Sequence, residues 1–160
     1  MEREAWKEPE WVWRTGCLLN SYRHWTGREL IDRDGSPLDQ AERLFRAPFV
    51  VLAHGNEANP ILNLGNRTAL DLWEMDLETF LTTPSRQTAE PDHREARSDL
   101  LARVERDGFI DDYSGIRISA TGRRFQIDRA TVWNLVDEAG ERVGQAATFS
   151  SWRFLDSEGR

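Results

Sequence analysis

The sequence predicts an α+β fold: a five-stranded antiparallel sheet with helices on one face, preceded by an N-terminal helical extension. The first observation is the order of hydrophobic periods, which runs helix, helix, two strands, three helices and three strands. The second is the length of the last three strands, which only the short turns ATG and DEAG separate. Strands at both ends of a run of helices usually form one antiparallel sheet that the helices cover. With 160 residues and 39% hydrophobic content, the chain can bury one core in one domain.

The first 47 residues are predicted to be mainly helical. We expect residues 1–9 to be a flexible tail, and residues 10–31 to form a helix because apolar side chains recur on one stripe. DRDGSP is a turn, in which Ser36 is placed to cap a second helix that stops before Pro48. Residues 10–47 therefore make up the N-terminal extension. The stripe of the first helix consists of Trp11, Leu18, Tyr22 and Trp25.

A hairpin and short helices follow the extension. The segments 48–55 and 61–66 are rich in apolar and β-branched residues and flank the polar turn NEANP, which predicts an antiparallel pair. Asn66 is a suitable N-cap for a helix of about two turns, and Asp76 is one for the next short helix. Residues 82–91 have the composition of a loop.

The second half of the chain contains the long elements. Residues 93–108 place apolar side chains at helical spacing and end on a glycine, which is a natural helix terminator. Three strands, at roughly 109–119, 123–136 and 141–152, complete the predicted sheet. We expect residues 154–160 to be a second flexible tail.

This arrangement resembles a PAS domain, in its β-β-α-α-α-β-β-β order, its capping Asn66 and the glycine-containing turns of its last strands. The segments LNSYRHWTGREL, APFVVLAHG, LNLGNRTALDLWEMDLETF, GFIDDYSGIRISATGRRFQI and TVWNLVDEAGERVGQAATFSSW are more closely similar to the PAS-related MEKHLA family, over roughly residues 17–153. That family occurs as free-standing bacterial proteins, the type expected here, and at the C-terminus of plant class III homeodomain–leucine-zipper factors. The resemblance implies a PAS-like domain at 48–153 with a sensing or partner-binding role, and it brings no catalytic residues. The string MEKHLA and a homeodomain or zipper are absent from this sequence, so the plant DNA-binding role does not transfer.

Composition narrows the classes of partner and compartment. The formal net charge of −7 argues against non-specific nucleic-acid binding, which requires a basic face. Cys17 is the single cysteine, so the chain has neither an internal disulfide nor a CxxC site. No apolar run reaches the roughly 20 residues of a membrane span, and the N-terminus lacks the apolar core of a signal peptide. We therefore expect a cytoplasmic protein with no nucleic-acid or membrane partner.

The last strands carry the candidate ligand-binding residues. If the DEAG turn closes symmetrically, the expected cross-strand pairs are Trp133–Gly144, Thr131–Ala146 and Arg129–Thr148. By resemblance to PAS domains, this sheet face lines a ligand cavity. A buried Arg129 then requires a carboxylate, which either a small anionic or polar ligand or an internal acid such as Asp111 or Asp112 supplies. Arg117 joins this face only in one register of strand 109–119, which the sequence leaves open. The candidate set is Arg117, Ile127, Arg129, Thr131, Trp133, Ala146 and Thr148.

Two explanations account for the stripe of the first helix. It packs on the outer face of the chain's own sheet, or it forms an interface with a second copy or a partner protein, because exposed tryptophans are costly in a monomer. The outer sheet face is the other candidate for a homodimer interface. Its residues are Val132, Val136, Val143 and Phe149.

We expect a sensory or interaction module that binds a small ligand or a partner and has no output domain of its own. No pair of histidines has the spacing of a metal site, and we expect no metal, no cofactor and no catalytic residues. The competing class is a small cone-shaped enzyme of the NTF2-like kind, with Asp111 or Asp112 and His93 as acid and base. A third alternative is a structural dimerisation module with a filled core.

Overall fold

The computed structural model of the chain describes residues 4–90 and 94–155. Its helices, where η marks a 3-10 helix, are η1 (Ala5–Lys7), α1 (Pro9–Thr26), α2 (Pro37–Phe45), α3 (Arg67–Trp73), α4 (Leu77–Phe80), η2 (Ser85–Thr88) and α5 (Arg94–Asp107). Its strands are β1 (Val50–His54), β2 (Leu62–Gly65), β3 (Phe109–Ile118), β4 (Arg124–Val136), β5 (Arg142–Phe149) and β6 (Ser151–Phe154).

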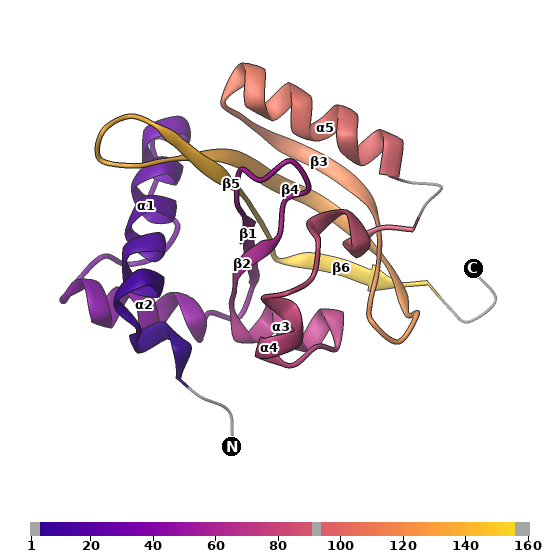
Figure 1. Cartoon of the computed structure of the whole chain (residues 1–160), viewed down its shortest axis with the longest axis horizontal. Coiled ribbons are helices and arrows are strands. Elements are labelled where there is room, and N and C mark those ends of the chain that lie inside the picture. Colours follow the sequence, from indigo (N-terminus) through magenta and orange to yellow (C-terminus); the bar gives the residue numbers. More distant parts are fainter. Residues whose placement is uncertain (1–3, 91–93, 156–160) are drawn as a thin grey trace.

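The strands form one antiparallel sheet in the order β2-β1-β5-β4-β3, and β6 pairs with β4 where the pairing of β5 ends (Figure 1). The α+β class, the antiparallel sheet and the N-terminal helices are confirmed. The predicted strand 141–152 is divided at Ser150 into β5 and β6. β5 pairs with β4 from Thr131 onward, whereas β6 pairs with β4 only as far as Asp128. The division therefore lies beside an irregular position in β4.

Local sequence signals explain the ends of several elements. The predicted hairpin is confirmed as the antiparallel pair of β1 and β2. Ser36 accepts a hydrogen bond from the backbone of Asp39 and Asp39 returns one, which completes a capping box at the start of α2. Asn66 caps α3 and Asp76 caps α4, as predicted. The first helix is shorter than predicted, because Gly27 adopts a left-handed conformation with φ of 75° directly after Thr26.

Helices cover both faces of the sheet (Figure 1). On one face, Leu100 and Val104 of α5 pack against Val132 of β4. On the other face, the indole Nε1 of Trp133 donates to the carbonyl oxygen of Leu18 in α1 at 3.3 Å. Adjacent residues of a strand point to opposite faces, so Val132 and Trp133 connect one strand to both helices.

The apolar stripe of α1 packs on the chain's own sheet, which confirms the first of the two explanations. Trp11, Leu18 and Tyr22 are buried, and the Tyr22 ring meets the Trp133 ring edge to face at 5.0 Å. Trp25 is half-buried and donates its indole N–H to the carbonyl oxygen of Asn134 at 3.0 Å. The sheet and the neighbouring helix thus bury most of the stripe within this chain, and an interface of the stripe with another chain stays a prediction.

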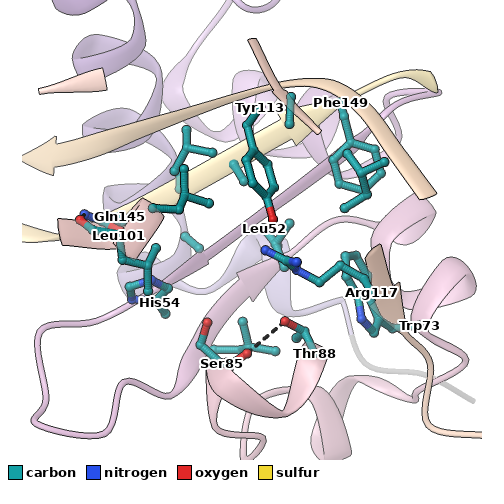
Figure 2. Close-up of a pocket in the computed structure, with 18 residues that line it drawn as sticks. Leu52, His54, Trp73, Ser85, Thr88, Leu101, Tyr113, Arg117, Gln145 and Phe149 are labelled. Carbon is teal, nitrogen blue, oxygen red and sulfur yellow. Dashed lines mark hydrogen bonds between the residues drawn. The ribbon is translucent and has the colours of Figure 1, made fainter. Parts of the chain in front are cut away.

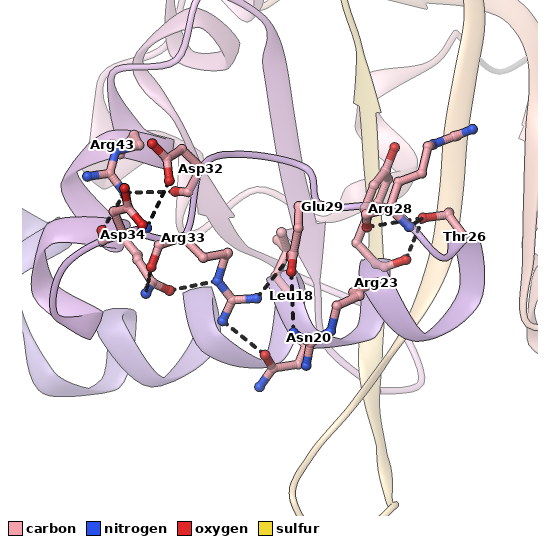
Figure 3. Close-up of polar contacts among 12 residues, drawn as sticks. Leu18, Asn20, Arg23, Thr26, Arg28, Glu29, Asp32, Arg33, Asp34 and Arg43 are labelled. Atoms are coloured by element: carbon pink, nitrogen blue, oxygen red, sulfur yellow. Dashed lines mark hydrogen bonds and ion pairs between the residues drawn. The ribbon is translucent and has the colours of Figure 1, made fainter.

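A polar network holds the loop between α1 and α2 (Figure 3). Arg33 donates to Asn20 of α1 at 3.0 Å and to Gln40 of α2 at 2.8 Å. Arg43 of α2 donates to the backbone oxygens of Asp32 and Asp34 at 2.7 and 2.8 Å. The two helices therefore form one layer.

The described part of the N-terminal segment is ordered against this layer. Ala5 and Trp6 lie in a 3-10 turn and are 1% and 5% exposed, so the expected flexible tail 1–9 is wrong for these residues. Residues 1–3 lie outside the described part, as do residues 156–160 of the expected C-terminal tail.

Candidate functional site

A pocket of about 70 Å³ lies between the sheet and the helices α3, η2 and α5 (Figure 2). One buried water needs about 10–15 Å³ by this measure, so the pocket has room for roughly five waters. The lining residues labelled in Figure 2 are Leu52, His54, Trp73, Ser85, Thr88, Leu101, Tyr113, Arg117, Gln145 and Phe149. The other lining residues are Ala53, Leu62, Leu100, Ile127, Ala130, Val132, Ala146 and Ala147.

Cross-strand pairs form the floor of the pocket. Ala147 of β5 pairs with Leu52 of β1 on one side and with Val132 of β4 on the other. Gln145 lies two residues before Ala147 in β5, on the same face of the sheet, and pairs with His54 of β1. A small side chain between two larger ones leaves space above the sheet. The central position of Ala147 therefore accounts for part of the pocket.

Arg117 is a buried cation in the wall of this pocket. The register of β3 pairs Arg117 with Phe125, which decides the question that the sequence left open. Arg117 is 8% exposed, its Nη1 donates to the backbone oxygen of Ile116 at 2.9 Å, and its guanidinium lies 5.4 Å from the centre of the Tyr113 ring. No carboxylate of the described residues forms an ion pair with it.

Two further polar side chains in the wall have an unused hydrogen-bonding atom. Trp73 is 1% exposed, and its indole N–H has no acceptor in the described structure. Gln145 is also 1% exposed and donates its amide N–H to the carbonyl oxygen of Leu101 at 3.0 Å, which leaves its Oε1 without a donor among the described residues. Because buried polar atoms are nearly always partnered, these two atoms are unusual features of the pocket.

Arg129 does not line the pocket, which corrects the expectation from the sequence. Its side chain is exposed, and its φ of 56° is in the left-handed region. It belongs to a bulge against β3, where Tyr113 pairs with Ala130 and Gly115 pairs with Ile127, so that two residues of β4, Asp128 and Arg129, stand opposite Ser114 alone. The bulge shifts the alternation of side chains by one residue. Ile127 faces the pocket before it, and Ala130 and Val132 face the pocket after it.

The remaining candidates divide between the two faces. Ile127 and Ala146 are among the lining residues, as is Arg117. Thr131, Trp133 and Thr148 are not. The bulge turns Thr131 and Trp133 toward the face that α1 covers, and Thr148 lies on the same face as its partner Thr131. The pairs also differ from the expected ones by two residues: Trp133 pairs with Ala146 and Thr131 with Thr148.

Sequence reasoning missed Trp73, Ala147 and Gln145. Trp73 was invisible because its helix reaches the pocket only through tertiary packing. Gln145 had a readable signal, since it alternates with Val143 and Ala147 on the apolar face of a predicted strand. A polar residue in such a position requires a partner inside the fold.

The two acids proposed for the enzyme alternative do not line this pocket. Asp111 and Asp112 are exposed and are not among the lining residues. His93 lies outside the described residues. Within the described ranges, there is no cluster of three or more His, Cys, Asp or Glu side chains that could hold a metal ion. None of the described helices combines the length and apolar character needed to cross a bilayer.

The fold is similar to solved PAS and LOV structures. The PAS domain of a protein from Colwellia psychrerythraea has a TM-score of 0.58 and 16% identity, covering 72% of this chain and 93% of that one. A PAS domain from a two-component sensor histidine kinase has a TM-score of 0.54 and 15% identity, covering 71% and 90%. An RNA-binding light-oxygen-voltage receptor has a TM-score of 0.59 and 14% identity, covering 75% and 33%. At these identities the likeness establishes the fold.

Comparisons of sequence identify the family. The homeobox-leucine zipper protein ATHB-9 of Arabidopsis thaliana is 29% identical over 98 residues, which are 61% of this chain and 12% of that protein. REVOLUTA, a homeobox-leucine zipper protein of the same plant, is 26% identical over 153 residues, covering 92% and 18%. The chain thus spans less than a fifth of these relatives. The family model of the MEKHLA domain matches residues 13–154, and the chain therefore belongs to the MEKHLA domain family.

Proposed function

We propose that this MEKHLA domain is a sensory module that takes up a small ligand in the pocket between the sheet and α5. The observation that carries the proposal is a buried cation, Arg117, that forms no ion pair within the described residues, together with the unpartnered buried atoms of Trp73 and Gln145, in a pocket that is otherwise mainly apolar. Leaving such atoms unpaired costs about 1–3 kcal/mol each. A ligand that pairs them removes this cost, which supports binding at this place.

The proposed response travels through β4 to the N-terminal helix. Val132 lies on the pocket floor, and its neighbour Trp133 contacts α1 through a hydrogen bond to Leu18 and a ring contact with Tyr22. A ligand that displaces the floor of the pocket displaces both faces of the same strand. The domain would pass this change to another protein, or to another domain, through α1.

The solved relatives support the sensory class. One similar structure is the PAS domain of a sensor histidine kinase, and another is a light-oxygen-voltage receptor. This chain has the same fold, with a pocket at the inner face of the sheet. We therefore favour sensing over the NTF2-like enzyme, whose acids lie outside the pocket.

A pocket-filling substitution tests the proposal. Ala147→Leu adds three carbons above the centre of the floor, and we expect a stability cost of about 1–3 kcal/mol because of overpacking. The wild type should carry small molecules that native mass spectrometry detects after mild purification, and its melting temperature should rise with members of a metabolite library. Both effects should disappear in Ala147→Leu.

Ala102→Leu, on the exposed side of α5, is the matched control and should behave like the wild type. If Ala147→Leu folds and shows the same bound molecules and the same melting shifts as the wild type, ligands do not use the pocket. The module would then act through surface contacts alone.

A further inference from the structure

We infer that the ligand of this pocket is a slender amphipathic carboxylate, whose carboxylate binds Arg117 and the indole N–H of Trp73 and whose apolar body lies along the sheet. The inference rests on the proposed function and specifies its ligand class. Three observations carry it: a buried guanidinium without a carboxylate, a second unused donor at the same end, and a narrow apolar floor.

The guanidinium of Arg117 requires an anion. It has five N–H donors, and in the described structure it uses Nη1 for one backbone oxygen and presents a face to the Tyr113 ring. A buried cation without a counterion is strongly disfavoured. The planar fork of an arginine matches the two oxygens of a carboxylate, which favours a carboxylate over a neutral polar group.

The indole N–H of Trp73 supplies a second donor at this end of the pocket. The Trp73 ring lies 5.1 Å from the ring of Phe125, the residue that pairs with Arg117 across β3 and β4. In Figure 2 the side chain of Arg117 starts beside Trp73 and reaches below Tyr113 toward the middle of the pocket, whereas Gln145 and Leu101 lie at the opposite end. A charged and a neutral donor that line the same part of the pocket suit a single oxyanion.

The rest of the pocket accepts a narrow apolar body. Leu52, Ala147 and Val132 form its floor. The Arg117 guanidinium lies against Tyr113, which pairs with Ala130 of β4. At the opposite end of the pocket, Gln145 pairs with Asn134 of β4. Four residues of β4 separate these levels, or roughly 13 Å at 3.3 Å per residue. A volume of about 70 Å³ spread over this length holds an unbranched chain and excludes a fused ring system or a haem.

Gln145 at the far end adds a specificity element. Its amide nitrogen is held by Leu101, so its oxygen is the atom that a ligand can use. A ligand with an O–H donor at the end of its chain pairs this oxygen, whereas a plain alkyl end leaves it unpaired.

The experiment uses titration calorimetry on the full chain, after unfolding and refolding to remove resident molecules. The probes are butyrate, octanoate, dodecanoate, 8-hydroxyoctanoate and octanamide. We expect octanoate to bind more tightly than the shorter and longer acids, and 8-hydroxyoctanoate to bind several-fold more tightly than octanoate. Octanamide, which has no charge, should bind about 30-fold more weakly, as expected for loss of a charge-assisted pair.

Arg117→Met removes the cation and keeps most of its volume. It should weaken octanoate binding about 30-fold or more and leave octanamide binding almost unchanged. Arg129→Met, which removes an exposed arginine of the same sheet, is the matched control and should bind octanoate like the wild type. Circular dichroism verifies that both variants fold, and a folded Arg117→Met protein is expected because removing an unpaired buried charge is seldom destabilising.

Equal binding of octanoate and octanamide, or full octanoate binding by Arg117→Met, would overturn the carboxylate assignment. The carboxylate assignment is also overturned if none of the acids binds but other compounds do, and if Ala147→Leu abolishes the binding of those compounds. In these cases the proposed sensory function survives. The proposed function fails as well only if no compound responds to the filling of the pocket.

Discussion

Replacing Asn66 with alanine tests how much one buried amide contributes to this fold. Asn66 lies between β2 and α3 and is 1% exposed. Its Oδ1 accepts hydrogen bonds from the backbone N–H groups of Ala69 and Val51, both at 3.1 Å. Its Nδ2 donates to the backbone oxygens of Phe49 at 2.8 Å and Leu44 at 3.2 Å. One side chain therefore joins α2, β1 and α3.

The expected cost follows from the fate of these four bonds. Losing an ordinary N-cap costs about 1 kcal/mol. The backbone oxygen of Leu44 still accepts from the N–H of Ala47 at 3.3 Å, so the N–H of Val51 and the oxygen of Phe49 are the two interior groups that lose the Asn66 side chain. Each of them left without a partner costs about 1–3 kcal/mol. We therefore expect Asn66→Ala to lower the free energy of unfolding by about 3–7 kcal/mol. With an entropy of unfolding of roughly 340 cal/mol/K for a chain of this length, the melting temperature should fall by about 9–21 °C.

Differential scanning calorimetry of two variants separates the cap from the network. Asp76 is exposed and caps α4 through a single bond to the N–H of Thr79 at 2.8 Å. Asp76→Ala should therefore cost about 1 kcal/mol, or about 3 °C. If Asn66→Ala lowers the melting temperature no more than Asp76→Ala does, the interior bonds of Asn66 contribute nothing measurable and the reasoning is refuted.

Two other predictions concern Cys17 and Arg129. Burial, and after it the negative charges of Glu138 and Asp137, raises the pKa of the Cys17 thiol from its usual 9.0 to about 11. Because the thiolate is the reactive form, at pH 8 the folded chain should react with a disulfide reagent about 100-fold more slowly than the chain unfolded in urea. Because the pKa of this thiol is higher in the folded chain than in the unfolded one, the thiol contributes stability below pH 9 that is lost as the pH rises from 9 to 11. Equal reaction rates of the folded and the unfolded chain with the reagent would contradict the burial of Cys17. Arg129 occupies a left-handed conformation, so Arg129→Gly should leave the melting temperature within about 2 °C of the wild type, whereas the β-branched Arg129→Val should lower it by about 3–6 °C. Circular dichroism melts of the two variants measure this, and a valine tolerated as well as glycine would mean that the bulge is not maintained in solution.

The predictable parts of the fold depend on neighbours in sequence. The caps at Ser36, Asn66 and Asp76, and the hairpin of β1 and β2, follow from signals within a few residues, because each stabilising bond is local. The same signals identified the α+β class. The cavity was implied by the resemblance to PAS domains, and Arg117 faced it in one of the two registers that the sequence left open for strand 109–119.

The position of the pocket was decided by tertiary structure. The alternation of β4 predicts one continuous face, and a bulge at an arginine gives no glycine signal, so Arg129 and the residues beyond it were assigned to the wrong side. The three interior bonds of Asn66 and the arrival of Trp73 at the pocket join segments that are far apart in the chain. By itself, the sequence determined the elements, their order and the family of this domain. Only the packing of strands and helices decided the pairing register, the side of the sheet on which each residue lies and the burial of each arginine. The reason is that a shift of one residue in β4 reverses the direction of every side chain that follows.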